Sequence, residues 1–401
     1  MNTSSYFNLF LSNIRLTPKQ KKNLIEGHTT LRSSLAEDPK LKNVIVTTFL
    51  QGSYRRATAL KDKNAKRADV DVVVVTNFDR NKVTPNQALE YFRAFLDIHY
   101  PGAYKFQGRS ISITLPDVDM DLVITSAPSE VNQKVLGMES VTDTRNLEEL
   151  GNDWRMTYEW TAPERRDAWT SSMFESLRKS EEWKAESLYI PDREKEDWEE
   201  TNPLEQIRWT RDKNKATNSH YVNVVKALKW WRMGKLTNRK YPKGYPIEHM
   251  IGDCCPDDIK SVAEGVVKTL DKILATYRWN RLTEKTPELI DRGVTSHNVW
   301  KRVSDSDFIN FYDHVKDAAA TARLAFDSEN VSDQIKYWRE LFGEEFPPLS
   351  EEDARNERLQ EKSKLLESGI LTVNSKIQIV AGSHGLSVPK ERNHYEITSD
   401  L

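Results

Sequence analysis

A Gly-Ser pair and an Asp-Val-Asp motif constrain this chain more than any other feature of its sequence. Gly52-Ser53 follows the apolar segment 44–50, and sixteen residues after Ser53 the motif Asp69-Val70-Asp71 opens a run of valines. Because a strand alternates its side chains, Asp69 and Asp71 point to one face and Val70 to the other. Two carboxylates in one small volume raise each other's pKa unless a cation lies between them. The pattern therefore predicts a site for a hard divalent cation, most naturally Mg²⁺.

A second acidic strand is predicted over 119–125. Apolar residues alternate along it and occupy one face, namely Val118, Met120, Leu122 and Ile124. Asp119 and Asp121 then lie on the other face. On a strand next to the Asp-x-Asp motif, either carboxylate could complete a metal-binding triad.

The Gly52-Ser53 pair is predicted to form the turn between strand 44–50 and a helix beginning over 54–59. A helix N-terminus after a small-residue turn presents unpaired backbone N–H groups and a positive dipole end, which suits the phosphates of a nucleotide. A Gly-Ser turn or an exposed Asp-x-Asp strand alone is commonplace. Their order, followed by a second acidic strand, favours a nucleotidyltransferase.

From Gln51 to Ala59 and from Ala68 to Val73 the sequence resembles the bacterial cGAS/DncV-like nucleotidyltransferases. These enzymes generate the signals of cyclic-oligonucleotide antiphage systems and belong to the DNA polymerase β-like superfamily. The Gly-Ser and Asp-x-Asp elements are shared by the whole superfamily, whereas four later segments narrow the match. They are Leu188–Asp192, Trp198–Pro203, Lys226–Trp231 and Pro242–Glu248.

The resemblance implies an α+β fold, in which a polymerase β-like nucleotidyltransferase sheet with flanking helices packs against a C-terminal helical domain. It implies catalytic and metal-binding roles for Asp69, Asp71 and Asp121, with two Mg²⁺ ions expected and Mn²⁺ as an alternative. Asp121 is preferred to Asp119 because in the family the ligand directly precedes an apolar segment ending in a small residue, here 122–125. Nucleoside triphosphates, ATP among them, would be joined into a cyclic di- or trinucleotide in antiphage defence, with release of pyrophosphate.

The resemblance also indicates nucleotide-binding residues. Gly52 and Ser53 would contact the donor phosphates, and Lys229 and, second to it, Lys226 would neutralise the triphosphate from the helical side. Tyr245 would be a stacking platform, because an aromatic ring offers every base a π-face. A solvated lysine or a core tyrosine is the structural alternative in each case.

One departure from the family pattern lies next to Tyr245. The family often carries serine where Gly244 stands in this chain. A hydroxyl contact to phosphate is then missing, and Lys243 is a candidate to replace it.

Charge and cysteine content restrict the class of protein further. The net charge is −2, from 59 Lys and Arg against 61 Asp and Glu, which is a poor match to binding duplex nucleic acid over an extended phosphate footprint. We therefore expect no nucleic-acid activator. The two cysteines, Cys254 and Cys255, are adjacent, which argues against a disulfide framework and a cysteine zinc site. Without a leader-like segment or a long apolar run, a cytoplasmic protein with no membrane contact is predicted.

Three regions are predicted along the chain: a nucleotidyltransferase core with an N-terminal helix over 1–203, a helical domain over 204–348, and a charged helix with a flexible tail over 349–401. The N-terminal helix is predicted at 18–35, and an amphipathic helix is predicted at 218–233. The family resemblance implies that neighbouring proteins regulate such enzymes, sometimes through the C-terminus, and the polar segment 382–401 could serve this role.

Two alternatives remain open from the sequence. One is nucleotidyl transfer to a protein, a small molecule or an RNA end. The other is a catalytically silent nucleotide-binding regulator. The combination of Gly52, Ser53, Asp69, Asp71 and Asp121 argues against the silent regulator, and the length of the chain argues against the smaller modifying enzymes.

Overall fold

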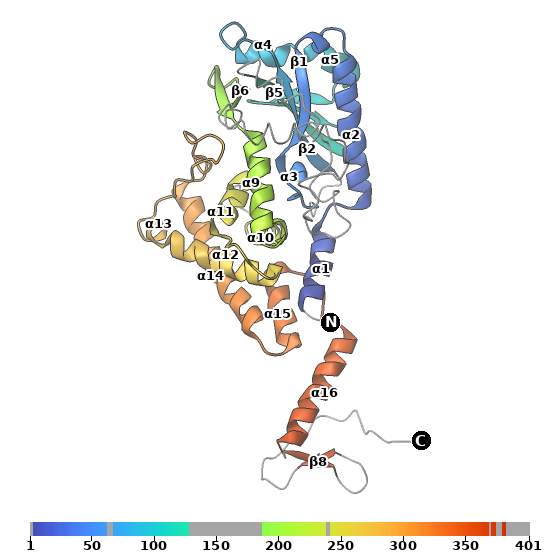
Figure 1. Ribbon diagram of the computed structural model, residues 1–401, viewed down its shortest axis with the longest axis vertical. Helices are drawn as coiled ribbons and strands as arrows, with labels where there is room; N and C mark the ends of the chain where they lie inside the picture. Colours follow the sequence, from blue (N-terminus) through green and yellow to red (C-terminus); the bar gives the residue numbers. More distant parts are fainter. Residues whose placement is uncertain are drawn as a thin grey trace, which may run out of the picture.

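The computed structural model describes residues 3–61, 67–127, 187–237, 241–368, 370–373 and 379–381. An upper lobe is built around a β-sheet, and a lower lobe consists of helices (Figure 1). The sequence pattern weakens over 131–184 and predicts a variable insertion there; this segment and the tail from 382 lie outside the described residues. The architecture confirms the predicted α+β class.

Within the described residues, the upper lobe contains a seven-stranded mixed sheet. β1, β2, β5, β4 and β3 follow one another across it, β6 pairs with β5, and β7 pairs with β6. The strands are β1 (Ile45–Gln51), β2 (Ala68–Thr76), β3 (Tyr104–Phe106), β4 (Ile111–Thr114), β5 (Val118–Ser126), β6 (Leu188–Asp192) and β7 (Asp197–Thr201). β2 and β5 run parallel at its centre, and their neighbours β1 and β4 run antiparallel to them. The two acidic strands predicted from the sequence are therefore direct neighbours.

One face of this sheet is covered by helices and is largely apolar. The covering helices are α2 (Pro18–Glu37), α4 (Pro85–Glu90) and α5 (Arg93–His99). Val70, Val72 and Val74 of β2 and the alternate residues of β5 pack beneath them. The residues between these, including Asp69 and Asp71, therefore face the opposite side, toward the helical lobe. The alternation predicted from the sequence is confirmed.

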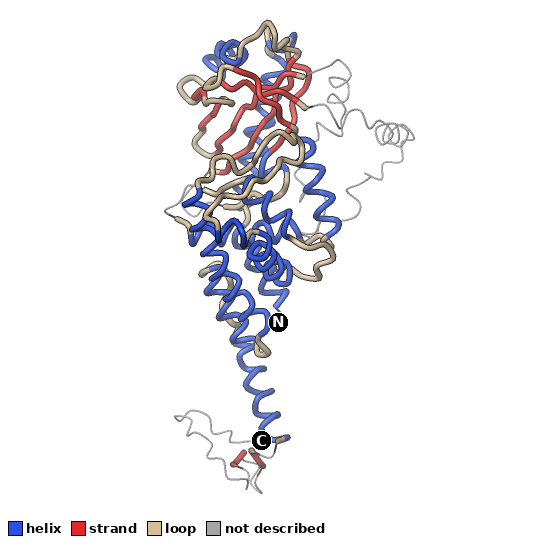
Figure 2. Tube along the Cα trace, turned by 90° about the vertical axis from the view of Figure 1, so that its left-hand side faces the viewer, coloured by secondary structure: helices blue, strands red, loops and turns tan. Residues whose placement is uncertain are grey.

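The other lobe consists of helices below the sheet (Figure 2). It is organised around a second hydrophobic core. Its helices are α9 (Pro203–Ala216), α10 (Tyr221–Lys235), α11 (Tyr245–Cys254), α12 (Val262–Thr276), α13 (Arg278–Leu282), α14 (Asp305–Asp327) and α15 (Val331–Phe342). Trp230, Trp300 and Trp338 are among its largest fully buried side chains. α16 (Glu351–Glu367) projects away from this lobe and carries the short strands β8 (Leu371–Val373) and β9 (Ile379–Ala381) at its far end (Figure 1).

The N-terminal helix α1 (Thr3–Ile14) corrects the predicted division at residue 203. Tyr6, Phe7 and Phe10 recur at helical spacing and are buried in the core of the helical lobe, beside α10 and α15. The first residues of the chain thus pack with the second lobe. The helix predicted at 18–35 is present as α2, but the sequence analysis missed α1.

Three further helices differ from prediction. The helix expected over 54–59 is a single turn, α3 (Gly52–Arg55), directly after β1. A short 3-10 turn, η1 (Leu41–Asn43), lies before β1. The sequence also predicts one helix from 84 to about 100, and in the structure this segment is divided between α4 and α5. α10 is buried around most of its circumference, so it is a core helix and not the amphipathic helix that the sequence predicted.

Candidate active site

Four carboxylates lie side by side on the open face of β2 and β5. In the parallel register Asp69 lies opposite Asp119, and Asp71 lies opposite Asp121. Paired positions in a sheet are about 5 Å apart, so the two acidic strands form one acidic surface. Like charges held this close must be offset by protons or by a cation.

The pKa values reflect this crowding. Burial first, and then the charges of the neighbouring aspartates, raise the pKa of Asp69 to about 7. Burial and Asp121 raise the pKa of Asp71 to about 6, although the Arg56 guanidinium acts in the opposite direction. The pKa of Asp121 is also raised, again mainly by burial. This part of the sheet therefore disfavours ionised carboxylates unless positive charge is supplied.

Asp119 has a different environment. The Nε of Arg67 lies 3.0 Å from Asp119 Oδ2. One of the four carboxylates thus already has a cationic partner from the protein, whereas Asp121 accepts a hydrogen bond from Ser112. The difference is consistent with the preference for Asp121 as the third ligand, which stays a prediction.

Gly52 is required by the geometry beside Asp71. Its φ is +74°, in the left-handed region that favours glycine. A Cβ atom added at this position would lie 1.7 Å from Asp71 Oδ2. Any side chain here would displace that carboxylate, so the glycine of the Gly-Ser pair allows the turn to lie against the acidic face.

The turn at Gly52-Ser53 is closed by its own backbone. Arg56 N donates to Gly52 O at 3.1 Å, and Thr58 N donates to Ser53 O at 2.8 Å. Because α3 is a single turn, it carries little of a helix macrodipole. The predicted phosphate contact would therefore come from local N–H groups and the Ser53 hydroxyl.

A buried ion network joins this turn to the helical lobe. Glu248 of α11 accepts hydrogen bonds from Arg56 Nε at 3.2 Å, Thr58 Oγ1 at 3.0 Å and Lys229 Nζ at 2.7 Å. Lys229 Nζ also donates to the carbonyl oxygen of Thr58 at 2.9 Å. Although burial opposes its ionisation, the two cations lower the pKa of Glu248 to about 2.

Glu248 and Arg56 were not among the site residues predicted from the sequence. Both stand inside the segments that carried the family resemblance. The available signal was a charged residue at 248 beside the apolar residues Ile247, Met250 and Ile251, which indicates a buried ion that requires a partner.

The three predicted nucleotide-binding residues of the helical lobe have different environments. Lys229 is about one-seventh exposed and reaches toward the Gly-Ser turn. Lys226 lies deeper, with a relative exposure of 1%. Burial, together with the cations Arg15, Lys21 and Lys229, holds the pKa of Lys226 well below its ordinary value. Its burial among cations favours Lys229 over Lys226, and the nucleotide-binding roles of both lysines stay predictions.

Tyr245 is half-buried at the first turn of α11. Its ring centroid lies 5.1 Å from Cζ of Arg56. Tyr245 is thus next to the guanidinium that lowers the pKa of Asp71. Gly244 before it has φ +60° and ψ −135°, a conformation that is strained for serine. The departure from the family pattern is thus matched by the local backbone.

Comparison with known proteins identifies the family. Residues 1–171 match the model of the Second Messenger Oligonucleotide or Dinucleotide Synthetase domain. The chain is 43% identical to a cyclic AMP-AMP-GMP synthase of Enterobacter hormaechei over 357 residues, which cover 86% of this chain and 92% of that protein. A probable cyclic AMP-AMP-GMP nucleotide synthase of Salmonella paratyphi B is also 43% identical, with the same coverage. This chain belongs to the cGAS/DncV-like nucleotidyltransferases. It is a cyclic oligonucleotide synthase.

The fold of this nucleotidyltransferase is also that of solved relatives. The CdnC protein of E. coli MS115-1, solved in complex with a HORMA protein, has a TM-score of 0.57 at 16% identity. The match covers 86% of this chain and 98% of CdnC. The polymerase β-like architecture predicted from the sequence is confirmed.

The donor set of this synthase suits a hard divalent cation. Asp69, Asp71 and Asp121 offer only oxygen atoms, and their pKa values are raised by burial and by mutual repulsion, which bound positive charge would relieve. As placed, no three histidine, cysteine or acidic side chains among the described residues converge on one point closely enough to ligate an ion.

Among the described helices, none is long and apolar enough to span a bilayer.

Proposed function

We propose that this synthase joins ATP and GTP into a cyclic trinucleotide containing two adenylates and one guanylate, and that two Mg²⁺ ions support the reaction, with Mn²⁺ as an alternative. The observation that carries the chemistry is the acidic face of β2 and β5 beside the Gly52-Ser53 turn. The two relatives at 43% identity are named for cyclic AMP-AMP-GMP, which supports the base composition.

In the proposed mechanism Asp69, Asp71 and Asp121 hold the metal ions. When bound, magnesium offsets the charge of the triphosphate and lowers the pKa of the acceptor ribose hydroxyl. Ser53 and the backbone of its turn orient the donor triphosphate. The hydroxyl oxygen bonds to the α-phosphorus, the bond from this phosphorus to the bridging oxygen breaks, and pyrophosphate leaves with that electron pair. The hydroxyl proton passes to solvent.

Product analysis tests this proposal. The purified full-length chain, incubated with labelled nucleoside triphosphates and Mg²⁺, is expected to yield a cyclic product whose mass corresponds to two AMP units and one GMP unit. Linear oligomers alone would contradict the proposed cyclisation, and transfer to an RNA end would favour the alternative activity.

Because the net charge is −2, duplex DNA or RNA is expected to leave the initial rate within about twofold of the rate without it. Strong stimulation would contradict the charge argument.

The assignment of the third carboxylate gives a second prediction. Asp121→Asn is expected to abolish synthesis, whereas Asp119→Asn should retain a measurable fraction because Asp119 is already paired with Arg67 at 3.0 Å. Initial rates at saturating Mg²⁺ measure the difference, and thermal unfolding shows that both variants are folded. Equal loss in the two variants would mean that the ligand set includes both residues.

We also propose that the product acts in antiphage defence and that a protein partner regulates the cytoplasmic enzyme. The HORMA complex of the CdnC relative supports regulation by a partner, since it records such an assembly for a protein of the same fold. A contact of the partner with residues 382–401 stays a prediction, because these residues lie outside the described part of the chain.

A further inference from the structure

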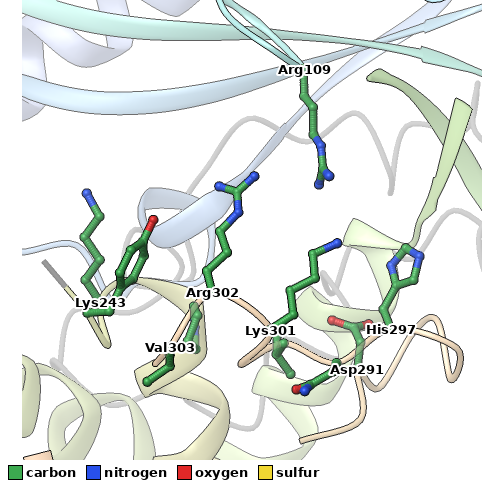
Figure 3. A pocket seen from close by; sticks show the side chains of 12 residues that line it. Arg109, Lys243, Asp291, His297, Lys301, Arg302 and Val303 are labelled. Carbon is green, nitrogen blue, oxygen red and sulfur yellow. The ribbon is translucent and has the colours of Figure 1, made fainter. Parts of the chain in front are cut away.

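The side chain of Tyr245 stands beside a cavity between the two lobes. The cavity has a volume of about 500 Å³ and is lined by residues of both lobes, among them Arg109 of the sheet lobe and Asp291 of the helical lobe (Figure 3). Gly244 and Pro246, the two neighbours of Tyr245 in the sequence, also line it. The direction of the Tyr245 ring therefore affects what can pack in this part of the cleft.

The position of Tyr245 in its helix does little to fix that direction. Tyr245 is the first residue of α11, and Gly244 precedes it. Long side chains of a helix point back onto the preceding turn, but a residue at the first position has no preceding turn to pack against. The orientation of the ring must therefore come from tertiary contacts.

His249 supplies such a contact from one turn further along α11. Residues four apart share one face of a helix. The ring centroids of Tyr245 and His249 are 5.8 Å apart and the two planes are at 87°, which is the edge-to-face arrangement that aromatic rings favour. His249 is only 3% exposed, so its own ring has little freedom to move. The imidazole thus limits the rotation of the Tyr245 ring.

The imidazole of His249 is in turn held by an ion pair. His249 Nδ1 lies 3.1 Å from Asp253 Oδ2, one turn further along the same helix face. The other oxygen, Asp253 Oδ1, accepts a hydrogen bond from Arg292 Nη2 at 2.6 Å. Arg292 Nη2 also donates to the backbone carbonyl oxygen of His249 at 2.9 Å. Arg292 therefore contacts both the backbone of His249 and the carboxylate that faces its ring.

Arg292 is fixed between an indole ring and α11. Its Cζ lies 3.5 Å from the ring centroid of Trp209 in α9, and its side chain is 11% exposed. A Cβ atom added at Gly252 would lie 2.8 Å from Arg292 Nη2 and 2.5 Å from Trp209 Cη2. The glycine thus allows the guanidinium and the indole to pack directly against the helix. A planar guanidinium held in this way is a rigid support.

We propose that His249 and Arg292 are positioning residues for Tyr245. Arg292 and Asp253 fix the imidazole of His249, and the imidazole fixes the ring on which a substrate base stacks. The inference rests on the stacking role predicted for Tyr245 within the proposed function. A ring that folding has already ordered loses less conformational entropy when a base stacks on it than a mobile ring would. The affinity for a base should therefore depend on His249 and Arg292, whereas the affinity for phosphate should not.

Binding to the full-length chain in the presence of Mg²⁺ tests the proposal. One probe is α,β-methylene-ATP, in which a methylene group replaces the oxygen of the bond that transfer would break. The other is inorganic tripolyphosphate, which carries no base. His249→Leu is expected to weaken binding of the nucleotide about tenfold, within the range for loss of one base stack, and binding of tripolyphosphate by less than about twofold. Tyr245→Leu should weaken binding of the nucleotide at least as much.

A double-mutant cycle separates positioning from general stabilisation. In the Tyr245→Leu background, His249→Leu should weaken nucleotide binding by less than about twofold more, because no ring remains to be positioned. His249→Phe should restore most of the affinity, since it supplies a ring that can again meet Tyr245 edge to face. Arg292→Lys keeps the charge but loses the planar fork, so it should weaken nucleotide binding about threefold. This variant also provides the test if His249→Leu is poorly folded.

His99→Leu is the matched control. His99 also contacts an aromatic ring, with its centroid 4.5 Å from that of Phe95, but it is an exposed residue of α5 on the covered side of the sheet. Its replacement should leave both affinities unchanged, and thermal unfolding shows which variants are folded.

Three results would overturn the proposal. They are equal weakening of nucleotide and tripolyphosphate, a full additional loss from His249→Leu in the Tyr245→Leu background, and unchanged nucleotide binding in Tyr245→Leu. The last result would remove the stacking role itself. Because binding is measured without turnover, none of these results depends on whether the product analysis finds a cyclic trinucleotide.

Discussion

Replacing Asp69 and Asp71 together by asparagine is expected to reduce cyclic product formation by at least roughly three orders of magnitude, since metal-ion stabilisation of the reacting phosphate contributes several kcal/mol. The variant keeps the shape of both side chains but removes two charges from the cation site. Initial rates with labelled ATP and GTP measure the loss. Wild-type product formation in the double variant would overturn the assignment of the acidic face.

Stability distinguishes loss of chemistry from loss of fold. The folded-state pKa values of about 7 for Asp69 and about 6 for Asp71 exceed the unfolded value of about 3.9. Their contribution to stability is therefore fully present below pH 4 and is lost as the pH rises through 6 to 7. At pH 8 without metal, the double variant should unfold at a higher temperature than wild type, and Mg²⁺ should stabilise only the wild type.

Asp117→Asn is the control for this experiment. Asp117 is exposed and lies in the turn before β5, so it belongs to the same acidic segment of sequence but is outside the paired residues of β2 and β5. Its replacement should change neither the rate nor the response to Mg²⁺.

Replacing Glu248 by glutamine is expected to lower the free energy of unfolding by about 3 kcal/mol and to reduce synthesis. The reason is that Arg56 and Lys229, which are 5% and 14% exposed, would lose their shared buried counterion. Arg56 also lowers the pKa of Asp71, so its displacement would disturb the acidic face. Denaturant unfolding measures the stability, and initial rates measure the activity.

Glu345→Gln is a matched control, because Lys61 and Glu345 also join the two lobes, at 3.0 Å, but their side chains are 25% and 35% exposed. Exposed pairs contribute at most about 1 kcal/mol, so this variant should lose little. If the two variants lost equal stability, Glu248 would be no more than an ordinary bridge between the lobes.

The pH dependence of stability gives a second readout for Glu248. Its folded-state pKa of about 2 lies below the ordinary value of 4.5, so its contribution is present above pH 4.5 and is lost as the pH falls toward 2. The aspartates of the acidic face have the opposite dependence at higher pH. Glu248→Gln should therefore flatten the acid limb of the stability curve and leave the slope between pH 5 and 7 in place.

The sequence alone determined the acidic face and its neighbours. Strand alternation is a local property with a period of two, so Asp69, Asp71, Asp119 and Asp121 could be assigned to one face before any fold was known. The Gly-Ser turn could be placed near them from chain order, since it ends the strand that precedes β2. The pairing of β2 with β5 confirmed that both acidic strands share one surface.

Only the tertiary structure decided which groups face that surface. Arg56 and Glu248 are separated by 192 residues, and no local pattern reports a partner at such a distance. The pattern along α10 does not show that α1, α11, α12 and α15 all pack against this helix, or that Lys226 is only 1% exposed. Arg109 of the sheet lobe and Lys301 of the helical lobe both lie near Glu199, at 2.6 and 3.9 Å, for the same reason. A sequence period fixes the direction of a side chain relative to its own strand or helix, whereas its charge environment depends on elements that only folding brings together.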